Sequence, residues 1–416
     1  MVAVQDVSVE LSAKVGRFLT GMKKSTEAIS ALSHQMSSIS RATAKMTAAL
    51  TAVGAGATVM SAKFEQQMTR TAAVAAGGAA GFDKAFSSMS SKALDMAGAT
   101  QFTARQVGEA MQFMAMAGMD TTKVMENIPG VLQLAAASGA DLGSSADIVT
   151  NIMASMGIAS KDLTDANNIL IGTFTSANVS LSELGQSFKM VGPVAKSLGM
   201  RTEEVAAAFG MMGNSGIKGT EAGTGLRRML VGLVGTAKKS KEGMADLGVS
   251  IDDISGPGGS FANMIKKLEE AQQRLGSTKF QQKLIDVFGQ LALPKIQALV
   301  EQGSAAYENL GSKISKARKE NIAFFLEQKQ LETLAGKYAI LESSIEKLAI
   351  SFGDILSPKV KGFVDSATSA VNAISNLDGE TKTTIANFGI AATSLLGVTS
   401  VISGLAAAFG FLVTNM

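Results

Sequence analysis

Apolar residues recur every three or four positions along most of the chain, and no stretch shows the strict alternation that is typical of a β-strand. This spacing places apolar side chains on one face of an α-helix, so it predicts an all-α fold. Two stretches keep the spacing for many turns, one toward each end, and shorter patterns separated by glycine lie between them. We therefore expect an elongated molecule in which coiled-coil-like rods flank a compact multi-helix core and a hydrophobic helix follows at the C-terminal end.

The first long pattern covers residues 15–67, within a predicted N-terminal amphipathic heptad helix at residues 1–70. Sixteen positions follow a 3/4 spacing, and thirteen of them are apolar. A register kept over so many heptads is typical of a helix that packs lengthwise on another helix. A helix that packs on its own domain is the alternative. The residues predicted to join copies of the chain here are Val15, Phe18, Met22, Ile29, Leu32, Met36 and Ile39.

Residues 71–247 are predicted to form the compact helical core, because their short apolar patterns end at Gly or Asn. Thr103 followed by Gln106 predicts a capping box at a helix start, and Gly118 is a natural end for that helix. The inward faces are rich in methionine, which fills irregular gaps between helices well. Further helices are expected at 122–138, 145–156, 160–175, 180–198 and 202–212.

Residues 248–305 are predicted to be a linker with short helices. The string VSIDDISGPGGS at 249–260 combines proline with several glycines, which is typical of an exposed loop or linker. Helices are expected at 261–275 and 279–301, and Pro294 should kink or break the second of them.

Residues 306–377 are predicted to form long amphipathic helices. A long helix should begin near residue 306 and end at Ser357-Pro358, because proline disfavours the helical conformation of the residue before it. All eight positions of its seam are apolar, namely Leu331, Leu334, Tyr338, Leu341, Ile345, Leu348, Phe352 and Ile355. The seam residues predicted to join copies of the chain are Leu331, Leu334, Leu341, Ile345 and Leu348.

Residues 378–416 are predicted to contain an uncharged hydrophobic helix, since no charged side chain follows Lys382. A bilayer core needs about 20 apolar helical residues, so residues 385–413 are a candidate transmembrane segment. A helix buried among partner proteins is the alternative, because small residues suit tight helix packing. No secretory signal is expected at residues 1–14, which include two acidic residues. The membrane candidates are Ile385, Phe388, Leu395, Leu396, Val401, Ile402, Leu405, Phe409, Phe411 and Leu412.

Composition argues against most kinds of catalytic site. The 416 residues include no cysteine and a single histidine, His34, which excludes thiolate or His-rich metal sites and a Ser-His-Asp triad. The 38 basic and 35 acidic residues give a net charge of +3, which is too small to indicate a nucleic-acid binder. No cofactor, metal site or catalytic residue is predicted, and the chain is not expected to be an enzyme.

A glycine-rich string at residues 216–228 is the closest approach to a phosphate-binding loop. Lys218 precedes the glycines instead of following them, and no strand leads into the string. The start of an amphipathic helix capped by Thr220 or Thr224 explains it equally well. Residues 11–70 carry eight basic and two acidic side chains, which fit either contacts to DNA phosphates or a merely basic helix surface.

Four ordered segments resemble the core of bacteriophage tail tape-measure proteins, over roughly residues 60–240. They are FEQQM from Phe64, ATQFTARQVGEAMQFMAMAGMD from Ala99, VLQLAAASGADLGSSADIVTNIMASMG from Val131 and KGTEAGTGLRRML from Lys218. Members of that family are usually much longer, and this chain has no distal domain or peptidoglycan hydrolase after its apolar segment. Either the tail is short or further sequence is missing.

The resemblance implies a structural virion protein in the lumen of a phage tail, which sets the length of the tail tube and assists genome delivery across the host inner membrane. It would be made in the host cytoplasm. The implied partners are further copies of the chain as a trimer or hexamer, the tail-tube protein, tail-tip or baseplate hub proteins, assembly chaperones, the host inner membrane, and DNA at the capsid-proximal end.

Two other classes of protein fit parts of the sequence. A membrane-inserting toxin or pore-forming protein shares the apolar helix and the amphipathic rods, and it should lyse vesicles on its own. A tail-associated cell-wall hydrolase should clear a cell-wall zymogram, and we expect a blank zymogram because the catalytic patterns are missing.

Overall fold

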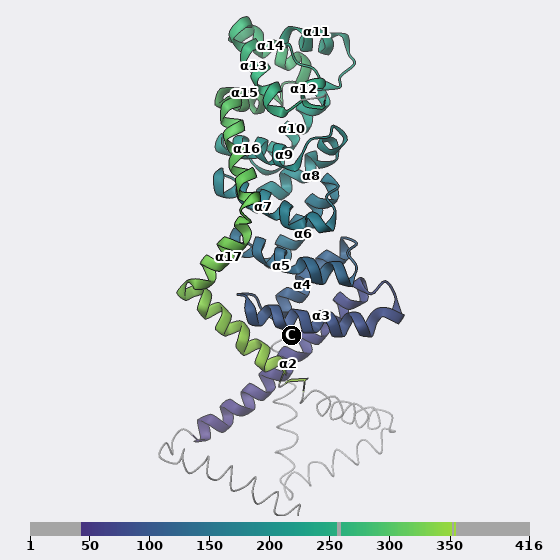
Figure 1. The fold of residues 1–416 in the computed structure, drawn as a ribbon, viewed down its shortest axis with the longest axis vertical. Coiled ribbons are helices and arrows are strands. Elements are labelled where there is room, and N and C mark those ends of the chain that lie inside the picture. The colour runs from purple at the N-terminus through teal and green to yellow at the C-terminus, as the bar shows by residue number, and fades with distance from the viewer. Residues whose placement is uncertain (1–42, 256–258, 352, 355–416) are drawn as a thin grey trace, which may run out of the picture. The chain divides into compact units, whose positions relative to one another are not determined.

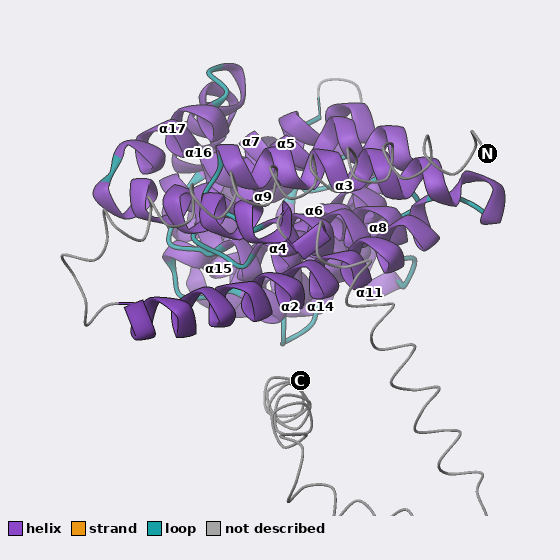
Figure 2. Cartoon of the chain, turned by 90° about the horizontal axis from the view of Figure 1, so that it is seen from below, coloured by secondary structure: helices purple, strands orange, loops and turns teal. Residues whose placement is uncertain are grey.

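The computed structural model describes residues 43–255, 259–351 and 353–354. All regular elements in these ranges are helices and none is a strand (Figure 2), which confirms the all-α prediction. The chain divides into two compact units, Met1–Gly353 and Asp354–Met416, and the described residues belong to the first apart from Asp354. The predicted seam at residues 15–39, His34 and the membrane candidates at residues 385–412 lie outside the described residues.

The helices follow one another closely along the first unit (Figure 1). The first half contains α2 (Thr43–Ala75), the 3₁₀ turn η2 (Ala79–Gly81), α3 (Phe82–Ala99), α4 (Ala104–Met116), α5 (Thr121–Ser138), α6 (Leu142–Met156), the 3₁₀ turn η3 (Ser160–Asp162), α7 (Leu163–Ser176), α8 (Leu181–Ser197) and α9 (Thr202–Asn214). The second half contains α10 (Gly219–Leu233), α11 (Lys238–Leu247), α12 (Asp252–Ser255), α13 (Phe261–Leu275), α14 (Ser277–Phe288), α15 (Leu293–Gln302), α16 (Ser304–Lys319), α17 (Ile322–Glu332) and a further helix at 334–351.

Two interleaved rows of helices make up most of this unit. Helices α4, α6, α8 and α10 contact one another in that order, and α5, α7 and α9 do the same beside them. Helix α16 packs on α7 and α9, whereas α17 packs on α5 and α7 (Figure 1). Each row grows by addition of one helix after another, as in repeat proteins, while α16 and α17 return along the row of α5, α7 and α9.

Side-chain caps fix where many of these helices begin. Thr103 accepts a hydrogen bond from the Gln106 backbone, and the Gln106 side chain accepts one from the Thr103 backbone, so the predicted capping box is confirmed. Asp141 is the N-cap residue of α6, and its side chain accepts a hydrogen bond from the Ser144 backbone. The helix therefore begins at Leu142, three residues before the predicted start at residue 145. Helices α5 and α6 end at glycines in the left-handed conformation, where a side chain would be strained.

The described parts of the segment predicted as a linker, residues 248–255 and 259–305, are packed into the core. Val249 and Ile254 are buried, and Lys267 of α13 forms an ion pair of 2.6 Å with Asp253 of α12. The helix expected at 279–301 is divided into α14 and α15, as Pro294 predicts. Proline lies in the first turn of α15, where its missing N–H costs nothing.

The single long helix expected to begin near residue 306 is instead three helices: α16, α17 and the helix at 334–351. The first break lies at Asn321, whose backbone is left-handed with φ of 48°. Its side chain accepts a hydrogen bond of 3.0 Å from buried Asn168, which in turn accepts one of 2.9 Å from the Ala323 backbone. The second break lies at Thr333, whose side chain accepts a hydrogen bond from the Gly336 backbone at the start of the last helix.

The C-terminal half of α2 packs on its own unit. Phe64 and Met68 are buried against the core, and the helix contacts α3 and α4. Met60 is one of the sixteen positions of the 3/4 spacing but is 46% exposed, because the buried face follows residues 57, 61, 64 and 68. For this part of the first long pattern, the structure therefore shows packing on the same domain.

Among the described residues, no helix is both long enough and apolar enough to cross a membrane.

Candidate functional site

A stripe of exposed apolar side chains runs along the helix at 334–351, the yellow-green helix after α17 in Figure 1. Between 56% and 86% of each side chain in it is exposed to solvent. Contiguous apolar surface on a folded protein is typical of an interaction site. We call this surface the apolar stripe, and its members are Leu334, Tyr338, Leu341, Ile345 and Leu348.

The opposite face of the same helix is packed on the rest of the unit. Ser343 and Ile350 are buried, and a side chain added at Gly353 would collide with Ala57 of α2. Lys347 forms an ion pair of 3.4 Å with Asp95 of α3. The helix is therefore held to its own unit by small and polar residues and turns its apolar face outward.

Glu346 adds to this polar attachment. Its carboxylate lies against Thr103 and Arg105 at the N-terminus of α4, where the helix dipole favours negative charge. Burial raises the pKa of this carboxyl above its usual range, and hydrogen bonding to Thr103 together with the charge of Arg105 opposes that effect in part.

Four of the five seam residues predicted in this region are thus brought together on one exposed surface, while Leu331 is half-buried in α17. The prediction that they join copies of the chain stays a prediction. Two exposed side chains on α17 were not predicted, Phe324 and Phe325, which are 46% and 50% exposed. The adjacent pair of phenylalanines is the signal that could have found them, since only one of two neighbours on a helix can face the core.

The glycine-rich string at 216–228 forms the start of α10 and serves helix packing. A Cβ at Gly223 would lie 2.8 Å from the Cα of Ser187 on α8 and even nearer to its carbonyl oxygen. Ser187 also donates a buried hydrogen bond of 2.8 Å to the carbonyl of Gly219. Helices α8 and α10 can approach this closely only because these positions carry no side chain.

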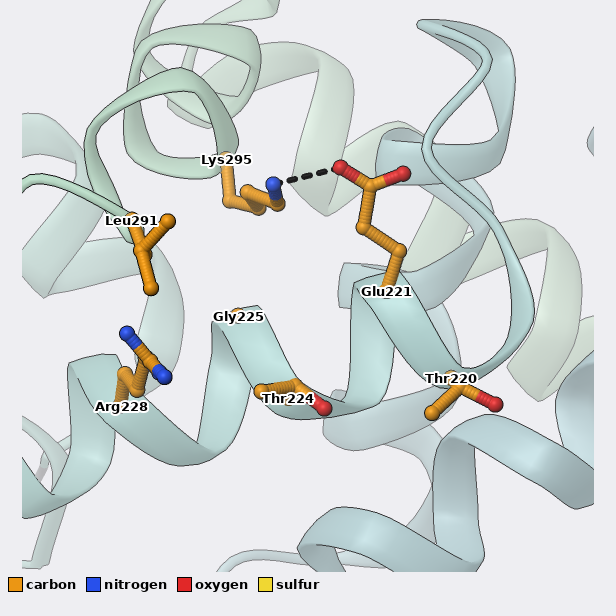
Figure 3. A pocket seen from close by; sticks show the side chains of 7 residues that line it. All are labelled: Thr220, Glu221, Thr224, Gly225, Arg228, Leu291 and Lys295. Carbon is orange, nitrogen blue, oxygen red and sulfur yellow. Dashed lines mark ion pairs between the residues drawn. The ribbon is translucent and has the colours of Figure 1, made fainter.

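A cleft of about 240 Å³ lies beside the same string (Figure 3). Lys295 of α15 crosses it to form an ion pair of 2.5 Å with Glu221 of α10, and Arg228 faces Leu291 on the other side. The lysine is thus neutralised by a carboxylate. The residues that line the cleft are Thr220, Glu221, Thr224, Gly225, Arg228, Leu291 and Lys295.

The interpretation of the string as a phosphate-binding loop gains no support. Lys218 donates a hydrogen bond of 3.0 Å to Asn178 and lies 3.9 Å from Glu183. The helix-capping alternative is wrong in its detail, because Thr220 and Thr224 lie inside α10 and the N-cap residue is Lys218, whose side chain does not cap the helix.

Titratable groups with perturbed pKa values do not assemble into a catalytic centre in the described ranges. Burial raises the pKa of Tyr307 well above its usual value, and the charge of Glu204 adds to this effect. The Tyr307 hydroxyl donates a hydrogen bond of 2.9 Å to the Glu204 carbonyl, which is a structural contact between α16 and α9. No group of three or more acidic or histidine side chains suited to a metal ion occurs among the residues that the structure describes.

The first of the segments that resemble tape-measure proteins forms a tight contact between α2 and α4. A Cβ at Gly108 would lie 2.8 Å from the sulfur of Met68, and Thr71 donates a buried hydrogen bond of 2.9 Å to the Gly108 carbonyl. Gln67 donates a hydrogen bond of 2.8 Å to Gln112 beside it. The shared sequence is therefore explained here by packing.

Comparisons with known proteins agree with this resemblance. The family model described as phage-related minor tail protein matches residues 90–289, from α3 to the end of α14. The tape measure protein of Pneumococcus phage Dp-1 is 26% identical over 315 residues, which cover 76% of this chain and 27% of that protein. The chain is similar to phage tail tape-measure proteins. The probable tape measure protein of Escherichia phage P2 is 23% identical over 205 residues, 49% of this chain and 25% of that protein.

The chain spans about a quarter of the length of these two relatives. No solved structure matches it. The matched family and both relatives carry descriptions of phage tail or tape measure proteins.

Proposed function

We propose that the chain is part of a tape measure that occupies the lumen of the tail tube, sets the length of the tube and assists delivery of the genome across the host inner membrane. The observation that carries the proposal is the similarity to tape measure proteins over three quarters of the chain. The long heptad pattern near the N-terminus supports it, because a continuous helix rises about 1.5 Å per residue and would relate chain length to tube length.

The partners follow from this proposal. Further copies of the chain, as a trimer or hexamer, would bury apolar seams against one another inside the tube, since closed symmetry is the rule for assemblies of identical chains. Tail-tube subunits would surround the chain, tip or baseplate hub proteins would hold one end, and chaperones would keep apolar segments covered before assembly. DNA would meet the capsid-proximal end.

A length test addresses the ruler role directly. Duplicating residues 15–42 in the phage adds four heptads, and we expect tails about 42 Å longer in electron micrographs if these residues are helical. Deleting the same residues should shorten the tails by the same amount. Tails of unchanged length in both variants would contradict the ruler role.

A matched control separates chain length from sequence. Replacing residues 15–42 by an unrelated heptad sequence of equal length should leave the tail length unchanged. If this replacement alters the length while the duplication does not, the segment acts through a specific contact and the ruler proposal is wrong.

The membrane role rests on the uncharged segment at 385–413 and is tested with liposomes. We expect the purified chain to associate with them and a deletion of 385–413 to abolish the association. A matched variant of full length carries Asp at Leu395 and Leu405, because a charge at the centre of a bilayer helix costs about 2.5–3.5 kcal/mol. Unchanged association of both variants would remove the membrane role.

The same preparations discriminate the other classes of protein. Release of a dye from vesicles by the purified chain alone would favour a pore-forming protein, and clearing of a cell-wall zymogram would favour a hydrolase. For a tape measure we expect neither, and instead co-purification with tube and tip proteins from disrupted virions.

A further inference from the structure

We infer that α17 and the helix at 334–351 form a strap that detaches from the core as one unit, with Asn321 as the hinge. The inference goes beyond the proposed function, because it concerns a second conformation of a single chain and holds or fails whether or not the chain sets tail length. Three features of the docked strap support it: a hinge backbone held by a tertiary contact, few buried apolar side chains, and a polar attachment to the core.

The backbone turn at Asn321 is held by a contact with the core rather than by the local sequence. Asn321 is the only residue other than glycine with a left-handed backbone in the described ranges. This conformation is unfavourable for every residue except glycine, although asparagine tolerates it better than most. Residues 304–332 contain no proline and a single glycine, Gly311, so no strong helix breaker lies at the turn. Once the hydrogen bond from Asn168 is broken, α16 can therefore continue into α17 as one helix.

The strap buries little apolar surface against the core. Ala323 and Ile350 are its only fully buried apolar side chains among the described residues, and Ile322 and Leu326 are half-buried. The apolar stripe already faces the solvent while the strap is docked, so detachment does not expose it. The apolar contribution that opposes detachment is therefore small. Helix α16, in contrast, is anchored by three large buried side chains, namely Tyr307, Leu310 and Ile314.

The rest of the attachment is polar. Glu327 is hydrogen-bonded to Gln133 of α5, and Lys347 forms its ion pair of 3.4 Å with Asp95. Such groups regain hydrogen bonds with water on detachment, so each contact contributes little net stability. Burial raises the pKa of the Glu327 and Glu346 carboxyls above their usual range, which means that each ionised carboxylate opposes docking.

The core beneath the strap has its own packing. Helices α5 and α7 contact each other and also pack on α4, α6 and α9, so they keep these neighbours when the strap leaves. The least anchored elements of a protein open locally in this way, well below the free energy of global unfolding. A docked strap offers a partner protein only its outward face, whereas a detached strap offers every face.

Two spin labels measure detachment directly, and the absence of cysteine from the sequence allows them to be placed freely. Ser91→Cys on α3 and Glu342→Cys on the strap are both at exposed positions. Ser91 lies one helical turn before Asp95, which the docked strap contacts. Pulsed EPR on the labelled full chain should give a short, narrow distance from the docked strap and a minor, broad component at longer distance.

Substitution of the hinge residue should shift these populations. Asn321→Ala disfavours the left-handed backbone and removes the hydrogen bond from Asn168, so the longer component should rise about tenfold relative to the shorter one. Asn321→Gly removes the same hydrogen bond but adopts a positive φ without strain, so its increase should be smaller. Asn309→Ala is the matched control, because Asn309 is exposed inside α16 and the hinge stays intact.

The EPR result can overturn the hinge in two ways. One is a longer component in Asn321→Ala that does not exceed the level in the wild-type chain or in Asn309→Ala. The other is an increase in Asn321→Gly that equals the increase in Asn321→Ala, because the left-handed backbone would then not be what holds the strap.

Hydrogen exchange decides whether the strap detaches as one unit from a folded core. In the wild-type chain, α17 and the helix at 334–351 should share one opening free energy, below that of α7. Lys347→Glu places like charges together beside Asp95 at the far end of the strap, and it should speed exchange in α17 as well. Exchange in α7 should stay at the wild-type rate. Faster exchange confined to the helix at 334–351, or an equal loss of protection in α7, would overturn detachment as a unit.

Discussion

The close contact between α8 and α10 makes a quantitative prediction for Gly223. In Gly223→Ala the new Cβ would lie 2.8 Å from the Cα of Ser187 and 2.9 Å from the Cβ of Met190, with the Ser187 carbonyl nearer still. Two of these three atoms belong to the backbone and cannot rotate away, so the two helices must move apart. Their separation would also stretch the buried hydrogen bond from Ser187 to the Gly219 carbonyl.

Two effects of opposite sign set the change in the free energy of unfolding of Gly223→Ala. Overpacking in a well-packed core costs about 1–3 kcal/mol, and contacts with backbone belong at the upper end of that range. Alanine in a helix interior gains about 0.8–1.0 kcal/mol over glycine. The free energy of unfolding should therefore fall by about 1–2 kcal/mol.

A glycine without close neighbours provides the matched control. Gly311 lies inside α16, and a Cβ added there meets no atom within 4 Å. Gly311→Ala should retain the whole gain in helix propensity and stabilise the protein by about 0.5–1 kcal/mol. The two substitutions are chemically identical, so their difference of about 2–3 kcal/mol reports only the packing at Gly223.

Urea denaturation followed by circular dichroism gives the free energy of unfolding of each variant from the midpoint and slope of its unfolding curve. Because the helices stack in rows, parts of the unit can open separately, so hydrogen exchange should be followed for each helix. Loss of protection in Gly223→Ala should concentrate in α8 and α10. If Gly223→Ala is as stable as the wild-type protein, propensity outweighs packing and the proposed reason for this glycine is wrong.

Three further predictions concern individual contacts. Asn168→Ala removes both hydrogen bonds that Asn168 makes at the start of α17, and it should cost about 1–3 kcal/mol with faster hydrogen exchange in α17. Burial raises the pKa of Glu346, so docking of its helix should be tightest below pH 4.5 and weaken as the pH rises through the raised pKa. Hydrogen-exchange rates of this helix, measured against pH, should show this dependence, and Glu346→Gln should remove it. Thr103→Ala breaks the capping box and should lower the urea midpoint by the equivalent of about 1 kcal/mol, with no such change in Thr69→Ala, an exposed threonine inside α2.

Local signals in the sequence predicted much of the core. The capping box at Thr103 and the break near Pro294 depend on residues close together in sequence, so their effect is visible without tertiary information. The break at Asn321 could not be predicted in this way. It depends on a hydrogen bond to Asn168, which lies more than 150 positions earlier in the chain.

Periodicity also could not show which face of a helix would be buried. The patterns in α2 and at 334–351 look alike in sequence, yet Phe64 is buried in the core whereas Leu334 is 86% exposed. The difference comes from the remaining faces of the two helices, which decide which side can pack on the core. On the side of the later helix that meets the core, Ser343 and Ile350 are buried and Lys347 forms an ion pair with Asp95.

The similarity to tape-measure proteins and the apolar stripe concern different parts of the molecule. The family model ends at residue 289, and within it the glycines at 108 and 223 are explained by close helix contacts. The stripe begins at Leu334, beyond the end of that match. Sequence similarity in this region therefore reports on how the helices pack, whereas the apolar stripe lies outside the residues that the family model covers. For this reason the role of the stripe must be tested on this chain, at positions 334 to 348.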